Sequence, residues 1–232
     1  GKMRRSGRKG IVGIEAAIVM IAFVIVASAF AFMVVNMGLT STQRSKEAIQ
    51  QGLKEASCPL TLDGSLLLKS DETYPNNVSA IIIPLKTLGV KYVPMWTNET
   101  VVSIKIGTKV ALANIYAGIN HTVDPTVKTF EEIIANVTSS SPPGHLTSWW
   151  NNLGVTDSKY QTGAVLIVEN DNGDDSLDFF EKGYLIIVLG TGHRAEPRDN
   201  ILIEIRPEKS APLTIEFTVP EAIPADAFVT VE

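Results

Sequence analysis

A long apolar segment, residues 11–39, limits what the rest of this 232-residue chain can be. Its sequence reads IVGIEAAIVMIAFVIVASAFAFMVVNMGL, and Glu15 is the one ionisable residue between Ile11 and Val35. A helix rises about 1.5 Å per residue, so this one is long enough to cross the roughly 30 Å hydrocarbon core of a bilayer. The segment is therefore expected to span a membrane or to pack in the core of a filament.

A basic leader precedes the apolar segment. Residues 1–10 read GKMRRSGRKG and contain five Lys and Arg and no acid. Positive charge on this flank predicts that it stays in the cytoplasm while the rest of the chain faces outward. A conventional secretory signal is cut after its apolar region. Here the suitable junction, Gly10–Ile11, comes before that region, so the apolar helix is expected to remain in the mature protein.

The leader, the junction and the start of the apolar segment resemble archaeal flagellins (archaellins) and, more loosely, type IV pilin-like proteins. The matching residues are RKG at 8–10, IVGIEAAI at 11–18 and the apolar run that ends with NMG at 36–38. Residues 163–232 also resemble archaellin tails. The resemblance implies that a prepilin-like peptidase cuts between Gly10 and Ile11. It also implies that Glu15, the fifth mature residue, serves assembly by meeting an N-terminal amine.

Other features of the segment agree with packing between helices. Gly13 and Ala17 have the small-xxx-small spacing that lets helices approach closely in an apolar environment, although alanine is also common in any membrane helix. A carboxylate in such a segment usually has a partner, but Glu15 could instead lie close enough to the interface to reach water. Helix-forming residues continue to residue 57, where Cys58-Pro59 ends the pattern. The predicted helix, residues 11–57, is roughly 70 Å long.

Residues 58–232 have the pattern of a β-rich head. Short runs of β-prone residues alternate with Gly, Pro, Asn and Asp. We therefore predict an α+β chain in which a long N-terminal helix precedes a β-sandwich, immunoglobulin-like or barrel-like head. One helix is predicted over Pro125–Val137, with Asp124 as its N-cap. The predicted strands are Leu60–Leu68, Val78–Leu85, Val101–Ile106, Val110–Tyr116, Ala164–Val168, Tyr184–Leu189, Ile201–Ile205, Leu213–Val219 and Phe228–Val231.

Charge and cysteine content exclude some functions. Residues 11–232 contain 15 Lys and Arg against 25 Asp and Glu, a net charge of −10. Binding to nucleic acid needs clustered Lys or Arg, so nucleic acid is not an expected partner. Cys58 is the single cysteine, so an intrachain disulfide cannot form. The head must rely on core packing or on neighbouring molecules.

Four N-x-[ST] sequons lie on the predicted exterior side of the helix. They begin at Asn77, Asn98, Asn120 and Asn136, and proline does not follow any of these asparagines. Four exceed the one or two that chance would place in a chain of this length. N-glycosylation at these asparagines is therefore predicted, with unmodified surface asparagines as the alternative. Asn136 is the least secure site because it falls in the predicted helix.

An acidic loop at residues 170–181 is the candidate metal site. Its sequence, NDNGDDSLDFFE, places oxygen ligands at positions 1, 3, 5, 7, 9 and 12 of a calcium loop. These ligands are Asn170, Asn172, Asp174, Ser176, Asp178 and Glu181. Against a true EF-hand, Asp175 stands where glycine is preferred, and strands rather than helices are predicted on both sides. The alternative is a solvated acidic turn. Calcium is the one candidate cofactor, and none is expected to be required.

The residue pattern favours a structural subunit over an enzyme. The three histidines show no metal-ligand spacing, and no G-x-S-x-G, P-loop or Rossmann pattern occurs. Trp149 and Trp150, with Trp96 and Tyr92, fit core or intersubunit packing better than a ligand platform. We interpret the chain as a subunit of an archaeal flagellar filament whose partners are copies of itself, a prepilin-like peptidase, membrane assembly machinery and, for the precursor, the membrane. The alternatives are an adhesion pilin and a monomeric membrane-tethered binding protein.

Overall fold

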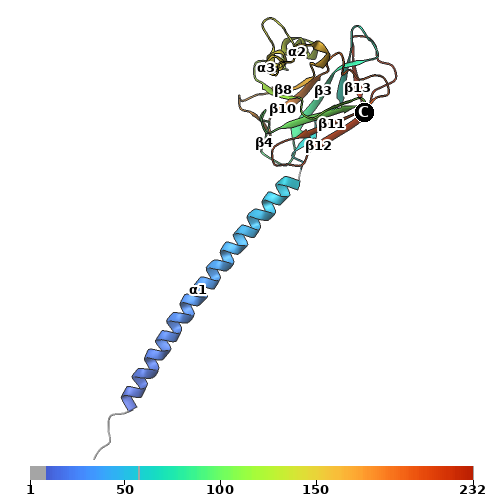
Figure 1. Ribbon diagram of the computed structural model, residues 1–232. Helices are drawn as coiled ribbons and strands as arrows, with labels where there is room; N and C mark the ends of the chain where they lie inside the picture. The colour runs from blue at the N-terminus through green and yellow to red at the C-terminus, as the bar shows by residue number, and fades with distance from the viewer. Residues whose placement is uncertain (1–8, 57, 232) are drawn as a thin grey trace, which may run out of the picture. The chain divides into compact units, whose positions relative to one another are not determined.

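The computed structural model describes residues 9–56 and 58–231 (Figure 1). It divides between Leu53 and Lys54 into two compact units, a helix and a β-rich head. The helix, α1, spans Lys9–Ala56. A helix was predicted over residues 11–57; residues 11–56 confirm it, and Ser57 lies outside the described residues.

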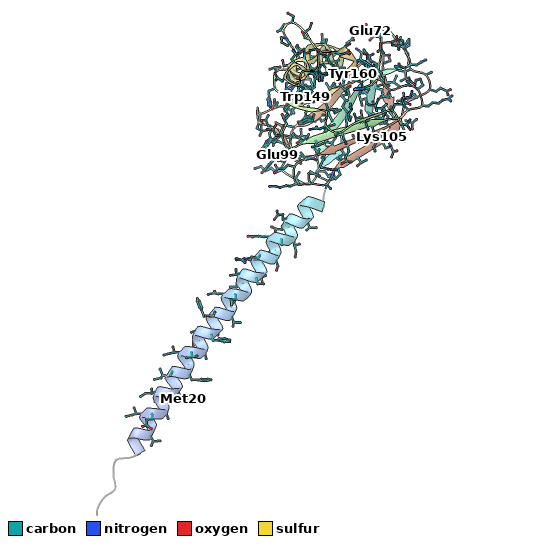
Figure 2. The ribbon with its side chains drawn as sticks, viewed as in Figure 1. Met20, Glu72, Glu99, Lys105, Trp149 and Tyr160 are labelled. Atoms are coloured by element: carbon teal, nitrogen blue, oxygen red, sulfur yellow. The ribbon has the colours of Figure 1, made fainter. Side chains whose placement is uncertain are left out.

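The sequence of α1 explains why it is continuous. It contains no proline, and good helix formers occupy about half of its positions. The hydroxyl groups of Thr40 and Thr42 donate to the carbonyls of Asn36 and Gly38, at 2.9 and 2.8 Å, so these polar groups are satisfied within the helix. Side chains such as Met20 project around the whole helix (Figure 2). From Val12 to Leu53, α1 has the length and composition to cross a membrane.

The head combines two main β-sheets and a short two-stranded ladder. The larger sheet has the order β13-β2-β3-β10-β8-β7, with β1 also paired to β3. The smaller sheet has the order β12-β11-β5-β6, and β4 pairs with β9. The strands are β1 (Leu60–Leu62), β2 (Leu66–Ser70), β3 (Val78–Thr87), β4 (Tyr92–Pro94), β5 (Val101–Ile106), β6 (Val110–Leu112), β7 (Tyr116–Asn120), β8 (Gly163–Glu169), β9 (Ser176–Asp178), β10 (Lys182–Val188), β11 (Asn200–Arg206), β12 (Leu213–Thr218) and β13 (Phe228–Val231).

The two main sheets enclose one core. Ile83 of β3 belongs to the same buried cluster as Ile104 of β5 and Ile203 of β11, so the sheets pack face to face. Of the arrangements predicted for the head, the structure adopts the sandwich. The alternation expected for a sheet with one wet face is present in β11, where Ile201 and Ile203 are buried and Glu204 is half-buried.

The other face of the larger sheet is covered by helices. They are α2 (Phe130–Val137) and α3 (His145–Asn152), which lie beside β8 and β10 in Figure 1; a short turn of 3₁₀-helix, η1, follows at Ser158–Tyr160. Ile133 of α2 and Trp150 of α3 share a second buried cluster with Ile82 of β3. The central strands are therefore buried on both faces, which explains the uninterrupted apolar run at 81–83.

The predicted helix over Pro125–Val137 was wrong in its first five residues. Asp124 does accept hydrogen bonds, from the amide and the hydroxyl of Thr126, but they close an isolated turn. The helix begins at Phe130, where Thr129 and Glu132 form a reciprocal capping box. This box satisfies two free amides at once, which explains why the helix starts there and not at Asp124.

Two predicted strands are each divided in the structure. Leu60–Leu68 is broken at Gly64, whose φ of +124° suits glycine alone. Val110–Tyr116 is broken at Asn114, whose side-chain oxygen accepts from the amides of Val102 and Tyr116. That change of direction carries the chain from the smaller sheet, at β6, to the larger sheet, at β7. The strands β4 and β9 and the helix α3 were not predicted.

Candidate functional sites

The first candidate site is the N-terminal part of α1. The predicted cleavage junction, Gly10–Ile11, lies within the helical backbone two residues after the described chain begins. Glu15 is exposed, and a Cβ atom built on Gly13 meets no other atom within 4 Å. Ala17 is also exposed, so this part of the helix offers a narrow surface that a neighbouring helix can approach closely. The roles predicted for Gly10, Ile11, Glu15, Gly13 and Ala17 stay predictions.

The second candidate site is the acidic loop between β8 and β10. Its backbone is folded by short-range hydrogen bonds: the side chain of each of Asp171, Asn172 and Asp174 accepts from the amide two residues later, at 2.8 to 3.0 Å. Gly173 has a φ of +88° and supplies the turn. The strand β9 then fixes the second half of the loop by pairing with β4.

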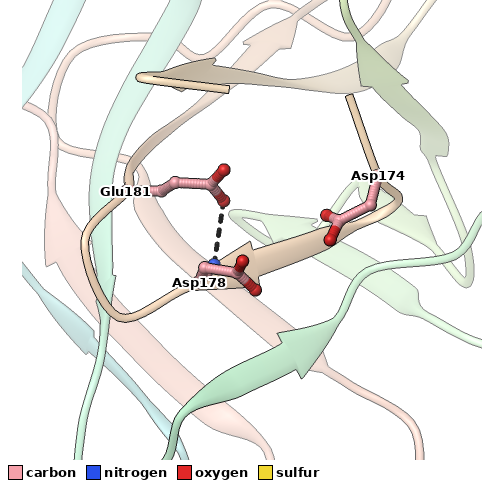
Figure 3. A group of neighbouring side chains, drawn as sticks. All are labelled: Asp174, Asp178 and Glu181. Carbon is pink, nitrogen blue, oxygen red and sulfur yellow. Dashed lines mark hydrogen bonds between the residues drawn. The ribbon is translucent and has the colours of Figure 1, made fainter. Parts of the chain in front are cut away.

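Three predicted ligands of the loop converge. One carboxylate oxygen from each of Asp174, Asp178 and Glu181 lies within 4.8 Å of the other two. Figure 3 shows Asp174 and Glu181 directed toward each other with Asp178 between them. Glu181 is only 2% exposed, and its two oxygens accept from the amides of Asp178 (2.9 Å) and Asn172 (3.1 Å). These three carboxylates therefore lie close together, and their role as calcium ligands stays a prediction.

The surroundings of Glu181 and Asp174 shift the pKa values of their carboxylates in opposite directions. Burial raises the pKa of Glu181, and the neighbouring charges of Asp178 and Asp174 act in the same direction, whereas backbone hydrogen bonds oppose them. For Asp174, partial burial is outweighed by hydrogen bonds from Ser176 and Asn172, so its pKa is lowered. A buried carboxylate with a raised pKa beside two others is costly when ionised, and a divalent cation would offset that cost.

The remaining predicted ligands are placed less favourably. The hydroxyl oxygen of Ser176 lies 2.7 Å from Asp174 and 3.1 Å from Asp178, so its single hydrogen can bond to either carboxylate. The amide group of Asn172 turns its nitrogen to Asp178 at 2.8 Å, so its oxygen would face an ion only after a rotation. Asn170, with a φ of +61°, lines a separate hollow together with His121 and Thr126. The donor set around Glu181 is all oxygen, which suits calcium rather than zinc.

One participant in the loop was missed at the sequence level. His121, just after β7, bonds through Nδ1 to Asp171 at 2.6 Å and through Nε2 to Asp175 at 3.2 Å. It fastens the loop to a strand about 50 residues earlier in the chain. A lone histidine between strands has no spacing signal, so its partner could be found only from the fold.

The four sequon asparagines differ in exposure. Asn98, in the turn after β4, and Asn136, on α2, are exposed, whereas Asn77 is half-buried. Asn120 is 6% exposed in β7, and its side-chain oxygen accepts from the amide and the hydroxyl of Thr122 at 2.8 and 2.7 Å. In the folded head, therefore, access favours Asn98 and Asn136 and disfavours Asn120.

Of the four aromatic residues considered as a possible ligand platform, two pack in the core and two are exposed. Trp150 is 3% exposed and donates from its indole nitrogen to the carbonyl of Thr162 at 3.3 Å, and Trp149 packs beside it against the helix-covered sheet face. Trp96 and Tyr92 are 48% and 57% exposed on β4 and the turn that follows. Core packing, the interpretation favoured from the sequence, is confirmed for Trp149 and Trp150.

Comparison with known proteins identifies the family. A profile of archaeal-type flagellins matches residues 10–217. The chain belongs to the archaeal-type flagellin family. It is 38% identical over 229 residues to probable flagellin 1 of Aeropyrum pernix, covering 98% of this chain and 99% of that one. It is 32% identical over 235 residues to probable flagellin 2 of Archaeoglobus fulgidus, covering 98% and 97%.

Solved structures show the same fold. The chain resembles the archaeal flagellum of Methanospirillum hungatei strain JF1 with a TM-score of 0.53 and 18% identity, covering 94% of this chain and 99% of that chain. It resembles flagellin FlaB1 of Methanocaldococcus jannaschii with a TM-score of 0.51 and 16% identity, covering 74% and 94%. The archaellin resemblance first seen at the N-terminus is thus confirmed over most of the chain. This flagellin is a structural subunit of an archaeal cell-surface filament, and the match favours that function over an adhesion pilin.

Proposed function

We propose that this flagellin is made as a membrane-anchored precursor with residues 1–10 in the cytoplasm and the head outside. A prepilin-like peptidase cuts between Gly10 and Ile11, and α1 then leaves the bilayer to join the same helix of other copies. The supporting observation is the exposure of α1. Every large apolar side chain from Val12 to Leu53 is at least 52% exposed, so this surface needs lipid or other copies to cover it.

Glu15 has a specific role in this proposal. A carboxylate costs about 2.5–3.5 kcal/mol at the centre of an apolar helix on insertion scales and less toward its ends, so an unpaired Glu15 near the start of the segment would still disfavour burial in a helix bundle. Cleavage before Ile11 would create a free amine on each mature chain. Pairing of Glu15 with the amine of a neighbouring copy would offset the cost, and it would do so only in the correctly staggered bundle.

The decisive experiment is mass spectrometry of the N-terminal peptide of flagellin in filaments sheared from cells. We expect the peptide to begin at Ile11. A peptide that still contains Arg8, or flagellin that stays monomeric after detergent removal, would contradict the proposal. The variant Glu15→Gln should be cut normally yet accumulate in the membrane with few filaments. Its matched control, Glu47→Gln on the polar part of α1, should assemble normally, because water can reach that position.

We also propose that a calcium ion binds at Asp174, Asp178 and Glu181 and stiffens the turn between β9 and β10. Support comes from the spacing of the three carboxylates and from the burial of Glu181. The ion would supply positive charge, while the protein's own hydrogen bonds keep the carboxylates in place. Isothermal calorimetry on the full chain should show binding that is lost in Asp178→Asn, while Asp157→Asn, in the turn before η1, should bind as the wild type does.

We also propose that the four sequons carry glycans to different extents. We expect glycans at Asn98 and Asn136, partial modification at Asn77 and none at Asn120, in the order of their access in the folded head. Glycopeptide mass spectrometry of sheared filaments measures the occupancy of each site. Full modification of Asn120 would show that the glycan is added before β7 forms, since that side chain is 6% exposed once the head is folded.

A further inference from the structure

A groove of about 430 Å³ lies on the head, between the end of β7, the last turn of α2 and one face of α3. Its volume falls within the range of small-molecule binding sites in proteins. The residues that line it include one histidine but no Asp, Glu, Lys or Arg. Such a lining suits a neutral ligand rich in hydroxyl groups better than a metal ion or a phosphate, which require charged partners.

The helix α3 turns an aromatic and polar face toward the groove. Four of its residues share the i, i+3, i+4, i+7 spacing of one helix face and line the groove: His145, Ser148, Trp149 and Asn152. On the opposite face, Leu146 and Trp150 are buried against the larger sheet. The packing of these two apolar side chains therefore fixes which face α3 presents to the groove.

Trp149 gives the groove an apolar wall (Figure 2). Its side chain is half-buried, and a Cβ atom built on Gly163 would lie 3.2 Å from Cζ3 of the indole, so one edge of the ring packs against β8. A sugar ring has an apolar C–H face and a rim of hydroxyl groups, so it can stack on an indole while polar neighbours bond to the rim. His145 is such a neighbour, because its Nε2 bonds to the carbonyl of Ala117 at 2.8 Å and the Nδ1 of the neutral ring remains an acceptor.

Asn120 adds a hydrogen-bond donor to the floor of the groove. The residue is 6% exposed, and its Oδ1 accepts from the amide and the hydroxyl of Thr122. Among the residues that the structure describes, its Nδ2 bonds to no other group, yet this nitrogen is not sealed inside the protein. Its two hydrogens are therefore available to a ligand in the groove that Asn120 lines.

The sequon asparagine Asn136 lines the same groove. It is exposed on the last turn of α2. A Cβ atom on Gly144 would collide with the carbonyl oxygen of Asn136, so glycine at this position lets α3 begin directly against that turn. The first sugar of an N-glycan is bonded to the amide nitrogen of its asparagine. A glycan on Asn136 would therefore begin in the groove, beside the aromatic and polar face of α3.

We propose that this groove binds the first sugars of the N-glycan attached to Asn136. Trp149 packs against the C–H face of a sugar ring, and Nδ2 of Asn120 donates to one of its hydroxyl groups. The inference rests on the proposed glycosylation of Asn136 and adds the site that holds the glycan. It also gives Asn120 a role that agrees with its burial, as a residue that recognises the glycan of another sequon. The bound glycan covers the junction of α2 and α3 and so stabilises the head.

A double-mutant cycle on flagellin purified from the cells that make it tests this contact. Asn136→Gln removes the glycan, and Asn120→Asp keeps the Oδ1 oxygen that Thr122 bonds but removes the donor. Asn120→Asp should lower the melting temperature of the head by about 2–4 °C more in the glycosylated chain than in the Asn136→Gln chain, as expected for one contact in a head of this size. The matched control, Asn98→Gln, removes a glycan outside the groove and should leave the effect of Asn120→Asp unchanged.

Quenching of tryptophan fluorescence by acrylamide gives a second readout that does not depend on stability. In a Trp96→Phe background the accessible indole is that of Trp149, because Trp150 is 3% exposed. The bound glycan should shield this indole in dissociated flagellin. Quenching should therefore increase in Asn136→Gln and stay unchanged in Asn98→Gln.

Glycopeptide mass spectrometry of the same samples separates this inference from the proposal on which it rests. An unmodified Asn136 overturns both the inference and the proposed glycosylation at that site. A modified Asn136 with additive melting temperatures and equal quenching overturns the inference alone. Shielding of Trp149 that appears only in assembled filaments would assign the groove to the glycan of an adjacent copy and would also overturn it.

Discussion

The helix α1 and the head bury their apolar residues in opposite ways. In α1 the side chains of Phe23 and Leu39 are 75% and 58% exposed, although both are as apolar as any residue of the head. In the head, Leu166 of β8 and Ile186 of β10 are 0% exposed because sheet and helix layers cover them. The head thus has a complete core of its own, whereas α1 depends on what surrounds it.

This difference separates stability from assembly within one chain. Substitutions in the sandwich change the free energy of unfolding of the head, because they remove contacts made inside the chain. Under the proposed polymerisation, substitutions in α1 change the contacts that the helix would make with lipid or with other copies. The two kinds of substitution should therefore be distinguishable by measurement, and the following predictions test how far the separation holds.

The largest effect is expected when the same substitution is made in each region. Leu166→Ala should destabilise the head by about 2–5 kcal/mol, because it removes a fully buried side chain from between two layers. Leu39→Ala should leave head unfolding unchanged and weaken the filament instead. Thermal unfolding of the full chain in detergent, followed by filament yield, measures both. A drop in head stability caused by Leu39→Ala would break the separation between the two regions.

Calcium should give the next largest effect, and it should act only on the head. Calcium at about 100 times its dissociation constant should stabilise the head by about 2.7 kcal/mol relative to excess chelator. Glu181→Gln should abolish that gain. In chelator at neutral pH, however, two effects oppose each other, because the variant no longer buries an ionised carboxylate but keeps only one of the two acceptors that bond the amides of Asp178 and Asn172.

The pH dependence gives this prediction a definite sign. The pKa of Glu181 is raised in the folded head, so in chelator its contribution is fully present below the unfolded value of 4.5 and is lost as pH rises through the folded pKa. The proposed calcium ion would bind the ionised form and should therefore reverse the loss at neutral pH. Equal calcium responses in wild type and Glu181→Gln, measured by melting temperature, would remove the proposed ion from this site.

The two regions also differ in how much could be predicted from sequence. The helix was predictable almost in full, because its length and apolar composition are local properties of residues 11–57. The core strands β3, β8 and β10 were also predicted, since their uninterrupted apolar runs identify them before the fold is known. Within the acidic loop, three of the six residues that the spacing named, Asp174, Asp178 and Glu181, have carboxylate oxygens within 4.8 Å of one another.

What could not be predicted depends on contacts between distant residues. The strand β4 is three residues long and contains Pro94, so it forms only because β9 lies beside it, more than 80 residues later. The helix α3, HLTSWWNN, has few strong helix formers and is held by Trp150 and Leu146, which are buried against the larger sheet. His121 joined the acidic loop through the same kind of long-range contact.

A smaller loss of head stability is expected when the capping box at the start of α2 is broken. Thr129 accepts from the amide of Glu132 at 3.3 Å, and Glu132 accepts from the amide of Thr129 at 2.9 Å. Thr129→Ala should cost about 1 kcal/mol of head stability, whereas Asp124→Ala should cost less, since Asp124 caps only an isolated turn. Urea unfolding of both variants measures these losses of stability. A larger loss in Asp124→Ala would support the longer helix, Pro125–Val137, that was predicted from the sequence.

The smallest effect is expected at His121, because its side chain remains 34% exposed. Partial burial acts to lower its pKa, but hydrogen bonds to Asp171 and Asp175 outweigh burial and raise it above the unfolded value of 6.5. The stabilisation from these bonds is therefore fully present below pH 6.5 and is lost as pH rises through the folded pKa. His121→Gln keeps the sequon at Asn120 and should lower the melting temperature at about pH 5.5 but not at about pH 8.5. Both proteins should be measured in chelator, so that calcium binding does not contribute to the melting temperature. If the melting-temperature difference between variant and wild type is the same at both pH values, His121 acts by packing rather than by charge.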